Sequence, residues 1–170
     1  MKNQIKSVIA LVAICAVVAI LLALTNALTL PVIEKAEAAA VQEALREVLP
    51  TGENFQLVEL GGMKLPLTVT EVYREQNGGY AVRLKTSGYS SGMVLLCGID
   101  AEGNVTGAVC LSSSETLGYE KTFGSRFIGK SAESVMDVDT VANATKTTSA
   151  YRNAVKDALE AVAILKEVAE

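Results

Sequence analysis

The sequence contains no histidine and only three cysteines among its 170 residues. Without histidine, the chain cannot use an imidazole as a general base, a zinc ligand or a haem ligand. Three cysteines are also too few for an iron–sulfur cluster held by four thiolates from one chain. Any redox chemistry of this protein must therefore be carried by an organic cofactor.

Basic residues are outnumbered as well. Fifteen Lys and Arg against nineteen Asp and Glu give a net charge of −4, and the isoelectric point is near 5.0. Proteins that bind a nucleic-acid backbone present a broad basic surface to its phosphates. This charge balance therefore argues against nucleic acid as a partner.

Apolar residues are in excess, at 50% of the chain with a mean hydropathy of +0.33. Every residue in 8–24 is apolar, and no charge occurs between Lys6 and Glu34. Because about 20 apolar residues span a bilayer, we expect residues 1–30 to form a transmembrane anchor that contacts lipid through residues 8–24. A cleaved signal peptide is the alternative, although apolar cores of signal peptides run only ~7–15 residues.

The flanks of this segment differ in charge. Lys2 and Lys6 precede it, whereas Glu34 and Lys35 follow it. The excess of positive charge on the cytoplasmic side of membrane proteins predicts a cytoplasmic N-terminus. We therefore expect a single-pass protein of the cell membrane with an extracytoplasmic C-terminal domain.

The rest of the chain has the pattern of an α+β domain. Residues 31–52 predict a helical stalk, ended by Pro50 and Gly52. Residues 53–170 form the domain, with β-rich runs separated by Gly- and Asn-containing turns, a loop-like segment over 112–148 and a final helix over 151–168. This order predicts a mainly antiparallel sheet flanked by helices. The four β-rich runs are 67–73, 80–86, 93–99 and 105–111.

Cys97 and Cys110 lie on the two arms of one expected hairpin. A two-residue turn at Gly103 and Asn104 would place them directly opposite one another, whereas a bulge at Gly103 would send their side chains to opposite faces. Two unbonded strand cysteines are the alternative to a disulfide, because few antiparallel pairs have the geometry of the bond. Cys15 lies in the apolar segment, where a free cysteine packs as a small apolar residue.

Residues 139–148 stand immediately before the final helix and are rich in Thr and small side chains. Backbone N–H groups at a helix start can hold an anion such as phosphate. In the simpler interpretation, Thr147 or Thr148 serves as the N-cap of that helix.

The same segment resembles the flavinylation motif of the FMN-binding domain family, in which Asp, two variable residues, Ser or Thr, Gly and Ala precede a hydroxyl residue that forms a phosphoester with FMN. Asp139, Ala144 and Thr145 match the motif in place. Ala142 stands where the family prefers a hydroxyl, and Asn143 where it prefers Gly, although Asn tolerates a left-handed backbone better than other residues. The resemblance implies covalent FMN at Thr145.

A second block, Glu115-Thr116-Leu117-Gly118, resembles the Glu-Thr-Pro-Gly loop that contacts the flavin ring in this family, with Leu117 in place of Pro. The resemblance implies that Glu115, Thr116 and Leu117 line the ring and that Gly118 lets the backbone approach it. Four aromatic residues are candidates for stacking on the ring, with core packing as the alternative fate: Tyr89, Tyr119, Phe123 and Phe127.

Within the FMN-binding domain family, the chain is similar to the G subunit of the Rnf electron-transport complex and, as a near relative, to the C subunit of the sodium-pumping NADH:quinone reductase. The resemblance implies an electron-carrier subunit, not a free-standing enzyme, that works with other membrane subunits of an ion-translocating ferredoxin:NAD oxidoreductase and needs a flavin transferase for maturation. Three alternatives stay open: a scaffold subunit without flavin, a subunit of the quinone reductase, and a flavinylated reductase outside any such complex.

Overall fold

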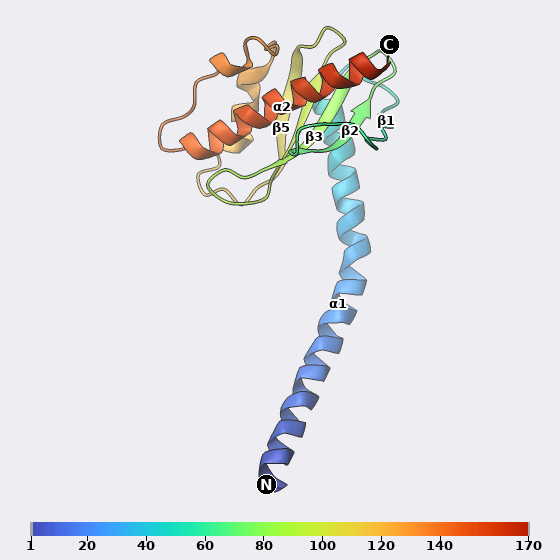
Figure 1. Ribbon diagram of the computed structural model, residues 1–170, viewed down its shortest axis with the longest axis vertical. Coiled ribbons are helices and arrows are strands. Elements are labelled where there is room, and N and C mark those ends of the chain that lie inside the picture. The colour runs from blue at the N-terminus through green and yellow to red at the C-terminus, as the bar shows by residue number, and fades with distance from the viewer. Residues whose placement is uncertain (1, 170) are drawn as a thin grey trace. The chain divides into compact units, whose positions relative to one another are not determined.

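The computed structural model describes residues 2–169, which form two compact units that divide between Ala40 and Val41. The first unit is the N-terminal part of helix α1 (Lys2–Val48) (Figure 1). Among the described residues, this is the one helix long and apolar enough to cross a membrane, and the side chains of its apolar stretch are not buried in the protein. The hydroxyls of Thr25 and Thr29 donate to the carbonyls of Leu21 and Thr25 at 2.9 Å, which satisfies both polar groups inside the helix.

The second unit contains a five-stranded antiparallel sheet in the order β1-β2-β3-β4-β5 (Figure 1). The strands are β1 (Gln56–Leu57), β2 (Val69–Arg74), β3 (Tyr80–Thr86), β4 (Met93–Ile99) and β5 (Val105–Ser112). Three short 3₁₀ helices follow, η1 (Tyr119–Lys121), η2 (Phe123–Phe127) and η3 (Val135–Asp137), and the domain ends in helix α2 (Thr145–Ala169). The α+β fold with an N-terminal apolar helix, expected from the sequence, is confirmed.

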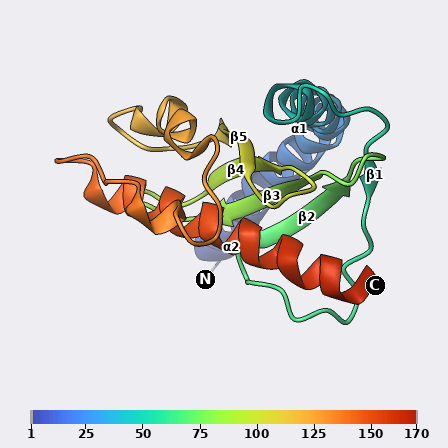
Figure 2. The ribbon, with the colours of Figure 1, turned by 90° about the horizontal axis from the view of Figure 1, so that it is seen from above.

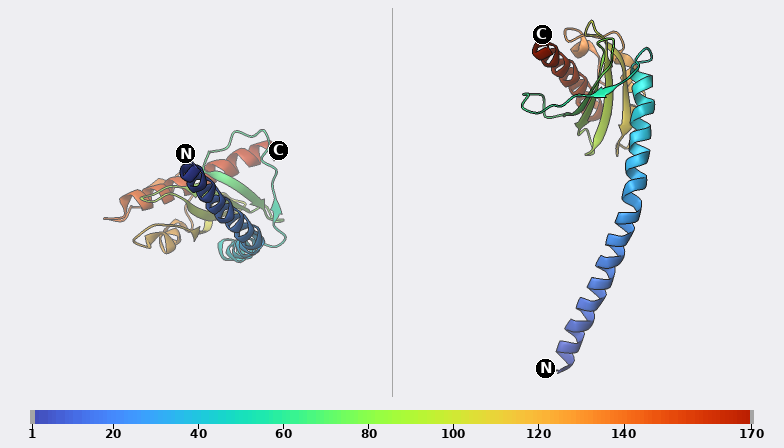
Figure 3. Two further views of the ribbon diagram at one scale, coloured as in Figure 1. Left: turned by 90° about the horizontal axis from the view of Figure 1, so that it is seen from below. Right: turned by 90° about the vertical axis from the view of Figure 1, so that its right-hand side faces the viewer.

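Side chains alternate between the two faces of the sheet along each strand. Both faces carry apolar side chains, and a helix covers each of them. Helix α2 lies along one face, as Figure 2 shows, and packs on a core that includes Leu84, Leu95 and Ile99. The last turns of α1, from Val41, pack on the other face against Ala81 and Leu96, and Figure 3 shows the sheet edge-on between these two helical segments.

Glycines on β4 and β5 allow the end of α1 to approach the sheet closely. A Cβ at Gly107 would lie 2.9 Å from Val48 Cα, and one at Gly98 would overlap the Val48 carbonyl. The same carbonyl accepts a hydrogen bond from Thr106 Oγ1. Residues 41–48 of α1 are therefore an integral part of the domain.

The register of the β4–β5 hairpin separates Cys97 and Cys110. Asp100 N donates to Asn104 O at 2.9 Å, and Gly103 in the turn has a φ of 92°. Beyond this turn, the pairing of β4 with β5 shifts again between Gly98 and Ile99, which places Cys97 opposite Ala108 and Cys110 opposite Leu95. Both expected relative positions are therefore wrong: the two thiols share one face but are displaced by two residue pairs along the strands. Both are free, as in the alternative of two unbonded strand cysteines.

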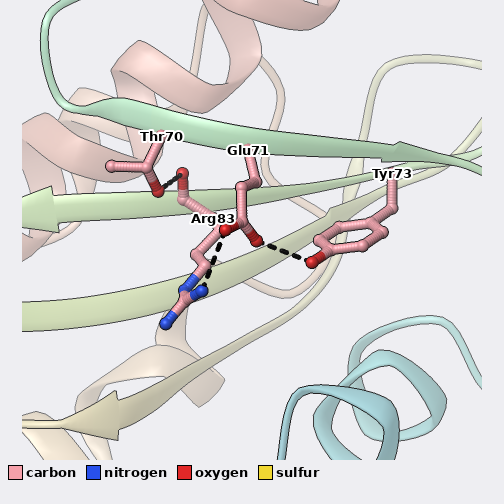
Figure 4. Close-up of polar contacts among 4 residues, drawn as sticks. All are labelled: Thr70, Glu71, Tyr73 and Arg83. Carbon is pink, nitrogen blue, oxygen red and sulfur yellow. Dashed lines mark hydrogen bonds and ion pairs between the residues drawn. The ribbon is translucent and has the colours of Figure 1, made fainter. Parts of the chain in front are cut away.

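A polar cluster on the other face of the sheet joins β2 to β3. Arg83 Nη1 donates to Glu71 Oε1 at 3.1 Å, and Tyr73 Oη donates to Glu71 Oε2 at 2.6 Å (Figure 4). Thr70 Oγ1 donates to the Arg83 carbonyl at 3.1 Å. Burial, together with the carboxylate of Glu71, raises the pKa of Tyr73 to about 12.

The segment expected to be loop-like carries an aromatic cluster. Phe123 and Phe127 are buried against Tyr151 of α2, with ring centroids 5.3 to 5.6 Å apart. Gly124 lies between them and the sheet, where a Cβ would overlap the Ala108 carbonyl oxygen and lie 2.5 Å from Tyr151 Oη. Both phenylalanines are therefore core residues, and residues 119–127 are held against β5.

Candidate functional site

A cavity of about 440 Å³ lies where three segments of the second unit meet. They are the loop after β3, the segment from the end of β5 through η1, and the start of α2. The wall includes six flavin-binding candidates named from the sequence, Glu115, Thr116, Leu117, Asn143, Ala144 and Thr145, and two of the stacking candidates, Tyr89 and Tyr119. Its other members are Glu120, Lys146 and Thr147. The size is that of a pocket for a small organic ligand.

Thr145 is the first residue of α2, and its side chain is exposed at the cavity. Its Oγ1 makes one long hydrogen bond, 3.5 Å to Val141 O. The preceding turn is closed by Ala144 N donating to Val141 O at 3.0 Å, and Asn143 within it has a φ of 67°. Asn is one of the few residues that adopts this left-handed conformation readily, so it maintains here a turn for which the related motif uses Gly.

The start of α2 is set by Thr148, which lies within the first turn. Thr148 N donates to Ala144 O at 2.9 Å, its Oγ1 donates to the same carbonyl at 2.9 Å, and Val141 N donates to that Oγ1 at 3.1 Å. The expectation that Thr147 or Thr148 is the N-cap of a helix beginning near residue 151 is therefore wrong. The hydrogen bonds between Thr148 and the preceding turn hold the helix from Thr145 onward, despite the modest helix propensity of its Thr-rich first turn.

The start of α2 offers backbone N–H donors and one basic side chain to the cavity. The first N–H groups of an α-helix have no acceptor within the helix, and its dipole favours negative charge there. Lys146 is the basic residue among the described residues that line the cavity, and its Nζ lies 5.9 Å from the centre of the Tyr89 ring. The cavity therefore has one end suited to an anion such as phosphate.

Glu115 joins all three segments of the site. Its Oε1 accepts a hydrogen bond from Ser90 N at 2.9 Å, and its Oε2 accepts one from Thr147 Oγ1 at 2.5 Å. A Cβ at Gly88 would lie 2.7 Å from Glu115 Oε1 and 2.8 Å from Thr147 Cα. The carboxylate therefore holds the loop after β3 against the first turn of α2, and the absence of a side chain at Gly88 makes room for it.

The walls beyond the helix start are largely apolar. Tyr89, Leu117 and Tyr119 line the cavity and remain 72%, 60% and 40% exposed. Exposed large apolar side chains around a pocket are typical of ligand sites. These residues offer apolar surface to an aromatic ring, in contrast to Phe123 and Phe127, which lie in the core.

Two of the residues named from the sequence lie outside the cavity wall. Gly118 precedes η1 with a φ of 70°, and a Cβ built on it would meet no atom within 4 Å. Asp139 is exposed, and its side chain makes no hydrogen bond to the described residues. Gly118 thus permits the turn into η1, where its positive φ requires glycine.

Two polar residues of the wall are not among the site residues predicted from the sequence. Lys146 directly follows Thr145, and only the start of the helix there distinguishes it from other lysines. Glu120 is 2% exposed, and its Oε1 accepts a hydrogen bond from Ser113 Oγ at 2.8 Å. Burial, and secondly the charge of Glu120, raises the pKa of Cys110 to about 11.

The donor set fits a ligand with an aromatic ring at one end and a phosphate at the other. Apolar side chains can cover the ring, while Lys146 and the helix start suit the phosphate. An exposed hydroxyl, Thr145, stands at the phosphate end. Within residues 2–169 there is no group of three acidic or cysteine side chains placed to hold a metal ion.

Residues 88–160 match the FMN-binding domain family. This range contains every segment that lines the cavity. The fold and the site thus define a flavin-binding domain.

Two curated relatives identify the group within that class. The chain is 36% identical over 138 residues to the G subunit of the Na(+)-translocating ferredoxin:NAD(+) oxidoreductase complex of Acetobacterium woodii, an alignment that covers 71% of this chain and 67% of that protein. It is 34% identical over 112 residues to the G subunit of the ion-translocating oxidoreductase complex of Stutzerimonas stutzeri, covering 62% of this chain and about half (49%) of that one. The chain belongs to the family of G subunits of Rnf-type ion-translocating oxidoreductase complexes, an electron-transfer flavoprotein family.

Proposed function

We propose that this chain is a membrane-anchored electron-transfer subunit that carries FMN as a phosphoester of Thr145, within an Rnf-type ferredoxin:NAD oxidoreductase. The observation that carries this proposal is the position of Thr145. Its hydroxyl is exposed at the first residue of α2, on the wall of the cavity that the FMN-binding family match contains.

The residues around Thr145 have distinct parts in this proposal. The N–H groups at the start of α2 and the side chain of Lys146 stabilise the phosphate diester. Thr116, Leu117 and Tyr119 contact the ring, and Glu115 positions the loop that carries Tyr89. Bound flavin supplies one-electron transfer, and the protein supplies orientation and electrostatics. Covalent attachment keeps the cofactor in place even where its noncovalent affinity is low.

In this proposal, Asp139 acts before the flavin is attached, and Gly118 acts beside the flavin site. Asp139 is exposed six residues before Thr145, where a flavin transferase can contact it during maturation. Gly118 shapes the turn into η1. We therefore include both in the flavin-binding set, with Glu115, Thr116, Leu117, Asn143, Ala144 and Thr145.

The arrangement in the membrane is part of the same proposal. Residues 1–30 anchor the chain, and residues 31–52 link the anchor to the flavin domain of residues 53–170 on the extracytoplasmic side. Residues 41–48 of this link pack on the sheet of that domain. The apolar stretch of α1 contacts lipid and the other membrane subunits, because its side chains are not buried against any other part of residues 2–169. The charges of Lys2 and Lys6 support a cytoplasmic N-terminus.

A scaffold without flavin is the second candidate, favoured by Ala142 and Asn143, which depart from the related motif. The left-handed φ of Asn143 weakens this alternative, because the turn before Thr145 is formed with Asn in place of Gly. The relatives described above favour an Rnf-type complex over a quinone reductase.

The deciding experiment is intact mass spectrometry of the chain purified from its native membrane, followed by fragmentation of the peptide that contains Thr145. We expect a mass increase equal to FMN less water, mapped to Thr145. Thr145→Ala should abolish the increase, while Thr140→Ala, a change in the same segment but outside the cavity wall, should retain it. An unmodified chain in a stably assembled complex would refute the flavin carrier and support the scaffold.

A further inference from the structure

Asn26 is a polar residue within the uncharged stretch of α1. No charge occurs between Lys6 and Glu34, and this stretch is about 40 Å long as an α-helix, whereas the hydrocarbon core of a bilayer is about 30 Å thick. A core centred on the stretch extends about 6 Å beyond the Cα atom of Asn26. In the membrane arrangement proposed above, lipid or protein therefore surrounds the Asn26 side chain, and water does not.

The polar side chains near Asn26 are satisfied within the helix, but that of Asn26 is not. The hydroxyls of Thr25 and Thr29 donate to helix carbonyls at 2.9 Å. The Asn26 backbone carbonyl accepts a further bond from Thr29 Oγ1, whereas the Asn26 carboxamide forms no hydrogen bond within residues 2–169. A carboxamide has two N–H donors and a carbonyl acceptor, and leaving them unpaired in hydrocarbon is strongly unfavourable. Its partner must therefore come from another molecule.

A backbone carbonyl next to Asn26 also lacks its helical donor. Pro31 lies inside α1, and because proline has no N–H, it cannot donate to the carbonyl of Ala27, one turn earlier. The hydroxyls of Thr25 and Thr29 donate to other carbonyls. In membrane helices, neighbouring helices can satisfy groups that proline leaves free. Two adjacent residues of α1 thus offer hydrogen-bonding groups to a neighbour.

Asn26 also belongs to one side of α1 with the spacing of a helix-packing seam. We define the Asn26 face as five residues spaced alternately by four and three positions: Cys15, Ala19, Leu22, Asn26 and Thr29. This spacing places them along one side of a helix. All five are exposed, and most are small, which lets the backbones of membrane helices approach closely. The opposite side at the same level carries larger side chains, Leu21, Leu24 and Leu28.

We propose that the Asn26 face of α1 contacts a transmembrane helix of another subunit of the complex, and that a polar side chain of that helix forms a hydrogen bond with the Asn26 carboxamide. This inference rests on the proposed function, because it requires α1 to span the membrane within an Rnf-type complex. Both relatives are subunits of ion-translocating complexes. An ion path through a bilayer requires polar groups inside the membrane, which one apolar helix does not supply, so such a complex contains further membrane-spanning segments with polar side chains. A second copy of α1 is the alternative occupant.

The first test sets two versions of the full chain in competition for the native complex. Wild-type chain and Asn26→Leu are expressed together, and the complex is isolated through a tag on another subunit. Intact mass gives their ratio in the complex, divided by their ratio in the whole membrane. We expect Asn26→Leu to be depleted about three- to tenfold, the effect of losing a hydrogen bond between membrane helices. Thr25→Val, the matched control, removes a hydroxyl that is satisfied within α1 and should compete equally with wild type.

The direction of this effect separates a protein contact from a lipid contact. Asn26→Leu makes the helix more apolar and so favours its insertion into the membrane. If Asn26 faced lipid, the variant would enter the complex as well as wild type or better. Equal or greater incorporation of Asn26→Leu would therefore overturn the inference, and so would an equal depletion of Thr25→Val.

The second test identifies the partner by photocrosslinking in the same membranes. Benzoylphenylalanine replaces either Leu22, on the Asn26 face, or Leu24, on the opposite side of α1. We expect the probe at Leu22 to give an adduct with another subunit in higher yield than the probe at Leu24. An adduct of the Leu22 probe with a second copy of this chain would overturn the proposed partner. Equal yields from the two probes, or a higher yield from Leu24, would overturn the assignment of the face.

Flavin content, read from the same intact masses, separates this inference from the proposed flavin carrier. A chain without flavin at Thr145, in complexes that still discriminate against Asn26→Leu, would refute the carrier and support the interface. Flavin at Thr145 together with equal incorporation of Asn26→Leu would refute the interface alone. Absence of the wild-type chain from the isolated complex would refute both.

Discussion

The hydrogen bond between Glu115 and Thr147 should give a measurable coupling energy between the two sides of the flavin cavity. Glu115→Ala removes both of its hydrogen bonds, to Ser90 N and to Thr147 Oγ1. Hydrogen bonds to charged groups contribute about 1.5–3 kcal/mol each. Because Glu115 is only half-buried, we take the lower value and expect a loss of about 3 kcal/mol in the free energy of unfolding.

Thr147→Val tests one of these bonds alone. The side chain of Thr147 is 6% exposed, so valine replaces the hydroxyl by a methyl of similar shape in a buried position. We expect a loss of about 1.5 kcal/mol. If the hydroxyl acts through Glu115, the double variant should lose about 3 kcal/mol, less than the sum of the single losses, which gives a coupling energy of about 1.5 kcal/mol.

The assay is urea denaturation of the full chain in detergent, followed by far-UV circular dichroism, with the flavin content of each variant measured by intact mass. Glu115→Gln, which can still accept from Ser90 N, should lose about half as much stability as Glu115→Ala and keep more flavin. Additive losses, within about 0.3–0.5 kcal/mol, would refute the idea that this pair joins the loop after β3 to α2.

Further predictions concern the packing, the turn before the attachment site and the thiols. Gly124→Ala should prevent stable folding, because its Cβ would overlap a backbone carbonyl of β5, whereas Gly61→Ala, where a Cβ meets nothing within 4 Å, should leave the denaturation midpoint unchanged. Asn143→Val should lower the free energy of unfolding by about 1–2 kcal/mol, since a β-branched residue is strained at positive φ, and should lower the flavin occupancy measured by intact mass. Asn143→Gly should retain both the stability and the flavin occupancy. Equal behaviour of the two variants would contradict the need for a left-handed turn. Cys110 has a pKa raised to about 11, so its reactive thiolate is scarce at pH 8. The rate of its alkylation by iodoacetamide should therefore increase with pH toward pH 11. A rate that levels off near pH 9 would contradict the effect of burial on this pKa.

Local sequence determined the secondary structure wherever residue pattern and turn chemistry agreed. The β-rich runs bounded by glycine-containing turns predicted β3 and β4 with the observed limits. The uncharged segment before Glu34 gave a helix with the properties of a membrane span, because length and apolarity alone decide that property. Asn143 adopts a left-handed conformation, in keeping with its being one of the few residues other than Gly that do so readily.

Register and helix limits depended on contacts that local pattern does not contain. The turn at Gly103 shifts the pairing of β4 with β5, and the irregularity at Gly98 shifts it again, so the position of Cys97 relative to Cys110 follows from their sum. Likewise α2 begins at Thr145 because Thr148 binds the preceding turn, not because its first residues favour helix.

The motif containing Thr145 and the block starting at Glu115 could be named from the sequence, through their resemblance to the FMN-binding family. Their meeting around one cavity was decided by the tertiary structure, through hydrogen bonds that Glu115 accepts from residues 25 and 32 positions away along the chain. The same folding placed Lys146 at the phosphate end and buried Glu120 with one unpaired carboxylate oxygen. A side chain's burial and its partners depend on segments remote in sequence, so only the folded chain could distinguish these two residues from other charged residues on loops and helices.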